Sequence, residues 1–395
     1  MDAIYSSDGL TANHLHLLTL TSFYPSEGDD ASGCFVSEPL EWLAKQGIRS
    51  NVLAVQPFYR GRRRSGNPAV RGEWLRYFSL PGGLGLPTAG AFVFARIVRQ
   101  LRERHLAHPF HMIHAHGPLP CGHAAMLLSE ALNIPFVVSV HGRDAFATVQ
   151  VAGLPGEWCR RISRLVYGAA TRVICVSGHV REAVLEGMDR SCRTSVVYNG
   201  VDPEHFSPIP AAAAPALTVL SVGNLIPIKG HESLIRAVAS LWCEFPTLQL
   251  DIIGDGPERG RLEGLAGELR ASGKVHFLGR QSRAQVAHAM QQCTVFALPS
   301  RYEGLGCVYL EAMSCGKPAI ACVGQGIAEI IQQGTNGFLI DPNNDDELAV
   351  TLRTLFRDPA RCSDLGRVAR DNILNGLTLE QQAEKLLRIY QECLQ

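Results

Sequence analysis

Short apolar runs alternate with longer stretches of helical spacing along the whole chain. In the first half these runs predict strands at residues 15–20, 50–55, 112–115, 136–140, 173–176 and 195–198. In the second half they predict strands at residues 217–222, 249–253, 275–278, 295–298, 319–321 and 337–340. Helical spacing is found at residues 37–46, 123–132 and 379–394. Strands that alternate with helices are typical of parallel sheets, so we expect two such sheets and an α/β fold.

The run 207–216 is rich in proline and alanine and has neither periodicity nor a strand signal, so we interpret it as a linker. It divides the chain into an N-terminal domain at 1–208 and a C-terminal domain at 209–376, followed by a terminal helix at about 377–395. A chain of 395 residues with 46% apolar content can bury two cores.

Charge and cysteine content narrow the class of protein. The 37 basic and 37 acidic residues balance, which argues against a dedicated nucleic-acid binder. The twelve cysteines include no Cys-x2-Cys pair, so we interpret them as reduced thiols of a cytoplasmic protein. Residues 1–13 lack the order of a signal peptide, and no window reaches the roughly 18 apolar residues needed to span a bilayer.

Residues 59–77 combine many cations with interleaved rings. The arginines are Arg60, Arg62, Arg63, Arg64, Arg71 and Arg76, and the rings include Tyr59, Trp74 and Tyr77. Arginines attract anionic headgroups and aromatic rings settle at the membrane interface, which favours peripheral contact with the inner face of the cell membrane. A flexible, solvated loop is an equally good interpretation.

The stretch 300–316 carries the clearest functional signal. Glu303 and Glu311 lie on either side of a glycine turn that follows an apolar run. A strand, a glycine turn and a helix in this order leave the backbone N–H groups near Leu305, Gly306 and Cys307 without helical partners, so they can hold a phosphate or diphosphate. Carboxylates are good acceptors for sugar hydroxyls. The alternative is a buried loop with two surface glutamates.

Residues 299–321 resemble the Glu-x7-Glu segment of the retaining, nucleotide-sugar-dependent glycosyltransferases of family 4, which have the GT-B fold. Four further segments resemble family motifs: a first glycine loop at 24–36, an acceptor-domain histidine loop at 140–144, an interdomain segment at 197–206 and a phosphate-binding loop at 221–230. Gly33-x-Phe-Val and His114-Ala-His116 look most like the subgroup that acts in teichuronic acid, capsule and exopolysaccharide assembly.

The resemblance implies two Rossmann-like domains facing a central cleft, with the terminal helix returning to the first domain. It implies catalytic roles for His141, Glu303 and Lys229. It implies that the donor is bound by Gly33, Gly223, Asn224, Lys229, Gly254, Leu305, Gly306, Cys307 and Glu311. Within this set Glu303 would hold the sugar hydroxyls and Glu311 the ribose. Asn224 departs from the family, which often has a basic residue there.

Several roles stay open at this stage. His116 and Asp144 are candidates for orienting His141 or binding the acceptor. The glycines 254, 256 and 260 look like a dinucleotide fingerprint, but their spacing is one residue too long for the common form. His114 and His116 would share one face of a strand without a third metal ligand of matching spacing, and the chain has no Asp-x-Asp pair, so we expect no metal requirement.

The expected function is therefore retaining, metal-independent and cofactor-free transfer of a hexose-type sugar. The donor would be a UDP- or GDP-linked sugar, and the acceptor a saccharide or lipid-linked saccharide in cell-surface polysaccharide synthesis. A nucleotide-sugar epimerase or phosphorylase of related fold is one alternative. A non-catalytic nucleotide-sugar-binding protein is another.

Overall fold

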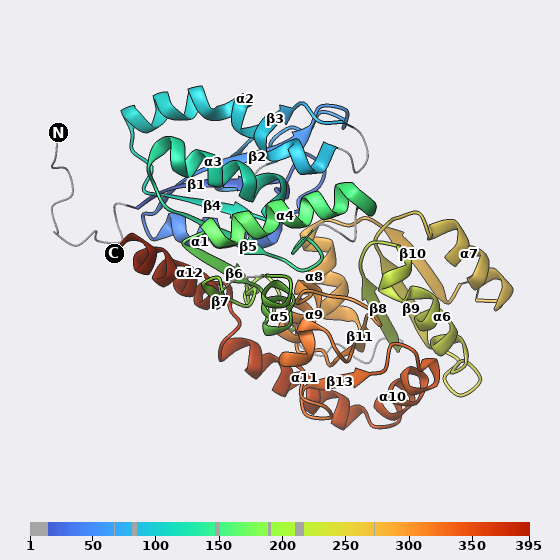
Figure 1. Ribbon diagram of the computed structural model, residues 1–395. Coiled ribbons are helices and arrows are strands. Elements are labelled where there is room, and N and C mark those ends of the chain that lie inside the picture. Colours follow the sequence, from blue (N-terminus) through green and yellow to red (C-terminus); the bar gives the residue numbers. More distant parts are fainter. Residues whose placement is uncertain are drawn as a thin grey trace. The chain divides into compact units, whose positions relative to one another are not determined.

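The computed structural model describes residues 15–66, 68–80, 85–146, 151–188, 191–209, 217–271 and 273–395. The chain forms two compact units (Figure 1). Unit 1 comprises Met1–Cys175, Arg181–Val197 and Ala383–Gln395, and unit 2 comprises Val176–Val180 and Tyr198–Gln382. The division at 208/209 stays a prediction, and most of the expected linker, 210–216, lies outside the described residues.

Unit 1 is built on a seven-stranded parallel sheet with the order β3-β2-β1-β4-β5-β6-β7. Its strands are β1 (His16–Thr21), β2 (Arg49–Pro57), β3 (Gly72–Tyr77), β4 (Met112–His116), β5 (Phe136–Val140), β6 (Arg172–Cys175) and β7 (Thr194–Val196). Every residue of β1, β4 and β5 is buried. Parallel strands covered on both faces read as continuous apolar runs, which explains why the sequence signal for these central strands is strong.

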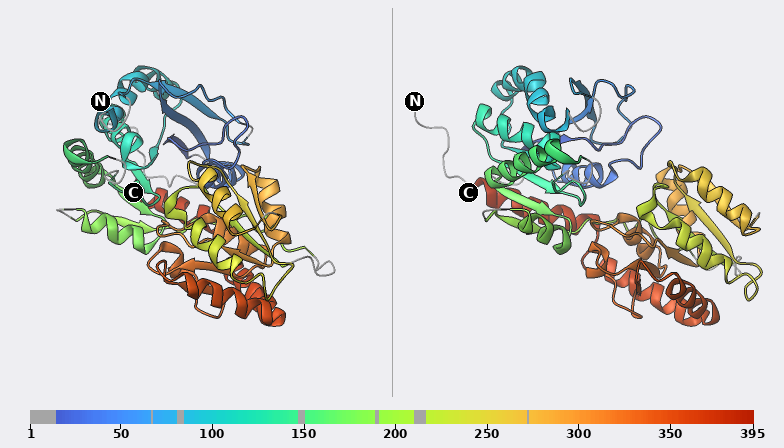
Figure 2. Two further views of the ribbon diagram at one scale, coloured as in Figure 1. Left: turned by 90° about the vertical axis from the view of Figure 1, so that its right-hand side faces the viewer. Right: turned by 45° about the vertical axis from the view of Figure 1, so that its right-hand side comes forward.

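Helices cover both faces of this sheet (Figures 1 and 2). On one face, α1 (Cys34–Lys45) and the end of α12 (Leu379–Leu394) share a core cluster with the strands. On the other face, α2 (Leu86–Ala107), α3 (His123–Leu132) and α4 (Gly153–Ala169) pack against one another. The last helix of the chain is therefore part of unit 1: Ala383, Leu386 and Tyr390 belong to its core.

Unit 2 has a six-stranded parallel sheet with the order β10-β9-β8-β11-β12-β13. Its strands are β8 (Thr218–Val222), β9 (Gln249–Ile253), β10 (Val275–Gly279), β11 (Val295–Ala297), β12 (Ala319–Cys322) and β13 (Gly337–Ile340). Its helices are α6 (His231–Ala239), α7 (Arg259–Glu268), α8 (Arg283–Gln292), α9 (Cys307–Ser314), α10 (Asp345–Arg357) and α11 (Pro359–Leu374). The helix α5 (Gly178–Glu186) begins in unit 2 and continues in unit 1.

All twelve predicted strands are present, and the predicted α/β class is confirmed. One strand was missed. β3 lies at 72–77, inside the segment interpreted as a membrane contact or a flexible loop, and pairs with β2 at the edge of the sheet. Glu73 and Arg76 are exposed on this edge strand, so it lacks the continuous apolar run that marks its neighbours.

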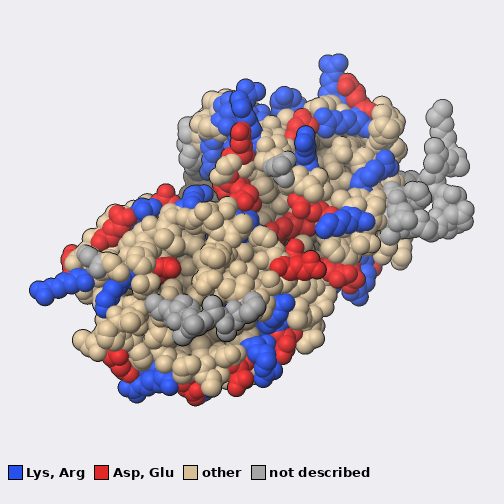
Figure 3. All heavy atoms as spheres, turned by 180° about the vertical axis from the view of Figure 1, so that it is seen from behind, with Lys and Arg blue, Asp and Glu red and all other residues tan. Residues whose placement is uncertain are grey.

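The surface charges agree with the balanced composition, and the cysteines agree with the expectation of reduced thiols. On the face shown in Figure 3, basic and acidic side chains are interspersed over both units. All twelve cysteines lie within the described residues and are free thiols. No helix in the described part of the chain is long and apolar enough to cross a bilayer.

Candidate functional site

The strongest sequence motif forms a helix N-terminus in unit 2. After β11 the chain turns, and Gly306 precedes the first residue of α9 with a φ of 85°. The Tyr309 hydroxyl, one turn into the helix, donates a hydrogen bond of 2.6 Å to the carbonyl of Leu298 and so fastens the helix to the end of the strand. The positive end of the helix dipole lies at this terminus, where the first N–H groups point out of the helix. Leu305, Gly306 and Cys307 thus lie at a helix N-terminus, as expected from the sequence.

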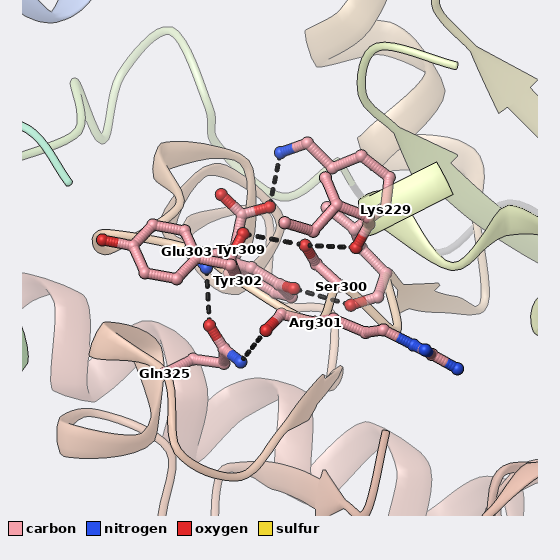
Figure 4. Close-up of polar contacts among 9 residues, drawn as sticks. Lys229, Ser300, Arg301, Tyr302, Glu303, Tyr309 and Gln325 are labelled. Atoms are coloured by element: carbon pink, nitrogen blue, oxygen red, sulfur yellow. Dashed lines mark hydrogen bonds and ion pairs between the residues drawn. The ribbon is translucent and has the colours of Figure 1, made fainter. Parts of the chain in front are cut away.

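Glu303 is held immediately before this helix (Figure 4). Its carboxylate is paired with Lys229, with 2.5 Å between Oε1 and Nζ, and both side chains are at least four-fifths buried. Its backbone N–H donates to the side-chain oxygen of Gln325 at 2.5 Å, and the Gln325 amide donates to the carbonyl of Arg301 at 2.7 Å. The structure therefore brings together two of the three predicted catalytic residues, Lys229 and Glu303. Hydrogen bonds to Gln325 hold the loop that carries Glu303.

Gln325 was not found by sequence reasoning. It follows β12 at the carboxyl end of that strand, which is where parallel α/β sheets place their functional loops. A search of every strand end for polar side chains could have found it.

The expected phosphate-binding loop follows β8. Lys229 ends the short helix η4 (Pro227–Lys229), and Asn224 is exposed on the same loop. A Cβ placed on Gly223 would meet no protein atom closer than 3.7 Å, so the fold of the protein alone does not require glycine at this position. Gly254 has a φ of +141°, and a Cβ there would lie 1.9 Å from the carbonyl oxygen of Gly223, so only glycine lets these two loops touch.

Glu311 is the second glutamate of the motif, and it has its own cation. It is 3% exposed on α9 and forms an ion pair with Arg283, the first residue of α8. The Arg283 guanidinium also lies 4.7 Å from the centre of the Phe206 ring. Sequence reasoning missed Arg283, because 28 residues separate it from Glu311 and only the packing of α8 against α9 brings them together.

In unit 1, His141 is part of a stack of rings. Its Nε2 is 3.0 Å from Nδ1 of His116, and the two rings are nearly parallel with centroids 5.2 Å apart. The Phe35 ring lies 4.7 Å from His141 on another side. Phe35 is placed there by Gly33, which precedes α1 with a φ of 81° and whose Cβ would lie 2.4 Å from the backbone of Tyr24. Gly33 thus has a structural reason to be glycine.

The histidine stack continues to the last helix. The rings of His114 and His116 lie 4.3 Å apart, and His114 hydrogen-bonds to the hydroxyls of Tyr390 and Ser139, each at 2.8 Å. Burial lowers the pKa of His141 to about 4 and that of His114 to about 3, and it holds the pKa of His116 well below its usual value. All three rings are therefore neutral at pH 7.

Asp144 holds the backbone of the histidine loop rather than the ring. Its Oδ1 accepts a hydrogen bond of 3.0 Å from the His141 N–H. Its Oδ2 and the Nδ1 of His141 are buried and have no hydrogen-bond partner among the described residues. Burial raises the pKa of the Asp144 carboxyl to about 6, because the charged form loses its hydration.

The arginine-rich segment separates into exposed and packed side chains. Arg60, Arg62 and Arg64 are exposed. Trp74 lies on β3, is partly buried against the unit 1 core, and is covered by the Arg63 guanidinium at 5.2 Å from its ring centre. Trp74 and Arg63 are thus engaged with each other. Among the described residues, no group of three or more potential ligands could hold a metal ion, and metal independence stays a prediction.

Comparisons with known families match both halves of the chain. Residues 35–205 match the model for Glycosyltransferase Family 4, and residues 205–372 match that for Glycosyl transferases group 1. An uncharacterized glycosyltransferase of Methanocaldococcus jannaschii is 31% identical over 66% of this chain and 69% of its own length. A GDP-mannose-dependent alpha-(1-6)-phosphatidylinositol monomannoside mannosyltransferase of Mycolicibacterium smegmatis is 27% identical over 90% of this chain and 92% of its own.

Solved structures agree on the fold. A sucrose-phosphate synthase from Thermosynechococcus elongatus superimposes with a TM-score of 0.78 at 22% identity, covering 95% of this chain and 98% of that one. Anabaena HepE, in complex with UDP and glucose, gives a TM-score of 0.73 at 21% identity, covering 95% and 99%. The two Rossmann-like units match structures of GT-B glycosyltransferases. The chain belongs to the glycosyltransferases of family 4 and has the GT-B fold.

Proposed function

We propose that the chain is a retaining hexosyltransferase that uses a nucleotide diphosphate sugar and needs neither metal nor cofactor. The observation that carries this proposal is the ion pair of Lys229 and Glu303 beside the N-terminus of α9. A mobile cation, a carboxylate and a helix dipole end within one loop system are the groups that a departing diphosphate and a sugar hydroxyl require.

On donor binding, the diphosphate competes with Glu303 for Lys229. The N–H groups of Leu305, Gly306 and Cys307 share the negative charge, and the loops at Gly223, Asn224 and Gly254 complete the donor site of unit 2. Gly33 stays a donor contact proposed from the family resemblance. Glu303 is then able to accept hydrogen bonds from the sugar hydroxyls, which a carboxylate does well. The ion pair with Arg283 holds the Glu311 carboxylate in place for the ribose. Lys229 and the helix N–H groups stabilise the negative charge that develops on the diphosphate as the anomeric bond breaks.

In unit 1, a neutral His141 steadies the reacting sugar. His116 holds the ring of His141, and Asp144 holds the backbone of His141. We propose a same-face substitution assisted by the diphosphate rather than a covalent glycosyl-enzyme. A retaining double displacement needs a carboxylate nucleophile close to a second carboxyl group. The two glutamates of unit 2 each have another role in this scheme.

The donor nucleotide is left between UDP and GDP, since a relative named above is GDP-mannose-dependent and a structural neighbour binds UDP. The acceptor is a saccharide or lipid-linked saccharide in cell-surface polysaccharide synthesis, and the enzyme works in the cytoplasm at the inner membrane face. The proposed contacts with anionic lipid are Arg60, Arg62, Arg63, Arg64 and Trp74. Because the Arg63 guanidinium covers the Trp74 ring, a lipid would meet Arg63 before Trp74. Unchanged vesicle binding after replacement of Arg62, Arg63 and Arg64 would remove this part.

The test is thermal stabilisation and nucleotide release with a panel of UDP- and GDP-sugars in the presence of a chelator. We expect one donor to stabilise the protein and to release its nucleotide without metal, and we expect both effects to be lost in Glu303→Ala. Release that depends on added Mg²⁺ or Mn²⁺ would contradict metal independence. Slow release of UDP without acceptor would favour the epimerase, and no shift with any donor would favour a non-catalytic binding protein.

A further inference from the structure

Unit 1 carries a cluster of exposed phenylalanine rings that the proposed mechanism does not use. Phe58, Phe78 and Phe92, here called the ring platform, are 43%, 54% and 39% exposed. Phe58 and Phe78 are stacked with an interplanar angle of 3° at 5.5 Å, and Phe92 meets Phe78 edge to face at 5.1 Å. Single exposed apolar residues need no explanation, but a contiguous group marks an interaction site.

The ring platform lies at the ligand-binding edge of the unit 1 sheet. Phe58 directly follows β2 and Phe78 directly follows β3, so both rings come from the carboxyl ends of strands. Open α/β sheets bind their ligands beyond these ends. The Phe58 N–H donates to the carbonyl of Tyr77 at 2.9 Å, and the Gln56 amide donates to the carbonyl of Gly61 at 3.2 Å. The loop that presents Phe58 is thus fixed at both ends.

Polar groups lead from the platform towards the central strands. Tyr77 is buried near Tyr59, Arg60 and the Cys121 thiol. Burial raises the pKa of Tyr77 far above neutrality, so its hydroxyl stays protonated. Cys121 in turn lies 3.6 Å from the Ser22 hydroxyl, just after β1. Hydroxyl and thiol groups therefore continue the platform along the strand ends.

Two features favour an aliphatic chain over a sugar ring as the occupant. A sugar stacks on an open ring face, whereas Phe58 and Phe78 each turn one face towards the other ring and Phe92 meets Phe78 edge to face. Arg60, Arg62 and Arg64 are exposed in the segment that follows Phe58 in the chain, and arginine suits a phosphate. Apolar rings beside guanidinium groups match an amphiphile with a hydrocarbon chain and an anionic head.

We propose that the ring platform seats the hydrocarbon chain of a phosphate-linked lipid acceptor while the neighbouring arginines bind its phosphate. This inference rests on the proposed function, because it names the acceptor class of the same enzyme.

The experiment is isothermal titration of the full chain with monomeric geranylgeranyl monophosphate. We expect saturable binding that Phe78→Ser and Phe58→Ser each weaken about tenfold, since each removes part of a buried phenyl contact. Leu106→Ser is the matched control: Leu106 is 83% exposed at the far end of α2, the helix that carries Phe92, and its replacement leaves binding unchanged.

Other occupants give different results. Equal affinity for inorganic phosphate would show that the chain adds nothing, and competition by free glucose would show a sugar platform. Binding only to phosphatidylglycerol vesicles would indicate a membrane surface, and a dimer lost in Phe78→Ser would indicate a second copy. Each of these outcomes overturns the proposal. Stabilisation by UDP- or GDP-sugars is measured on the same variants: it survives if only the platform is wrong and is absent if the donor function itself is wrong.

Discussion

The two units place their polar groups in opposite electrostatic states. In unit 2, Glu303 and Glu311 each form an ion pair with a cation of their own, Lys229 or Arg283. In unit 1, His114 and His116 are buried and His141 is partly buried; all three are neutral at pH 7 and are held by ring stacking and hydrogen bonds. Both arrangements lower the free-energy cost of removing polar groups from water. Unit 2 does so by pairing opposite charges, and unit 1 by keeping its rings neutral.

This difference indicates what each unit can bind. A paired cation can be transferred to an incoming anion, so unit 2 suits the charged part of a substrate. Neutral rings suit hydroxyl groups, which neither bring nor take charge. The comparison predicts that charge removal damages unit 2, whereas charge creation damages unit 1.

The largest effect is expected from Glu303→Ala. The variant loses the carboxylate that faces the donor and leaves Lys229 without its partner, so turnover at saturating donor falls roughly a hundredfold to a thousandfold. The measurement is steady-state turnover, with Glu311→Ala as control. Glu311→Ala should mainly raise the donor KM, and equal losses of turnover would contradict the division of roles between the two glutamates.

Replacement of Arg283 tests the second pair through stability. Arg283→Ala leaves the buried Glu311 carboxylate unpaired, and the free energy of unfolding should fall by about 3 kcal/mol. Denaturant unfolding of the variant measures this. Glu311→Gln in the same background should restore much of the loss, because it removes the uncompensated charge. No recovery would mean that the stacking of Arg283 on Phe206 carries the effect instead.

Acid should destabilise unit 1 by charging its histidines. The pKa of His141 is lowered from 6.5 to about 4. The stability that its neutral form provides is therefore fully present above pH 6.5. As the pH falls towards 4, the free energy of unfolding decreases by up to about 3 kcal/mol. Melting temperature against pH measures this. The Asp144 carboxyl has a raised pKa of about 6 and acts in the opposite sense, stabilising below pH 3.8 and losing that effect as the pH rises through 6. Asp144→Asn should therefore make the acid loss steeper.

The smallest effect is expected from Tyr390→Phe. This change removes one hydrogen bond to His114 and leaves the ring packing intact, so the free energy of unfolding should fall by about 1 kcal/mol. Chemical denaturation of the variant measures the change. Leu394→Ala, near the end of the same helix, is a comparison for packing alone, and a loss in Tyr390→Phe far above 1 kcal/mol would show that the whole ring stack depends on the hydroxyl.

The sequence predicted the parts of the molecule that are local in the chain. Central strands are continuous apolar runs, and the motif around Glu303 and Gly306 is contiguous, so both could be found by pattern. Arg283 and Gln325 reach the motif only through tertiary packing, and nothing near them in the sequence indicates their partners. The edge strand β3 was missed because an edge strand tolerates charged residues that a central strand excludes.

The return of α12 to unit 1 has a consequence for biosynthesis. Residues up to 197 leave the ribosome first, but the core of unit 1 also needs Ala383, Leu386 and Tyr390. At translation speeds of about 5 to 20 residues per second, the missing helix arrives roughly 10 to 40 seconds later. During this interval the apolar face that α12 covers is open to water, and the nascent chain offers a binding surface to chaperones until its last turn is made.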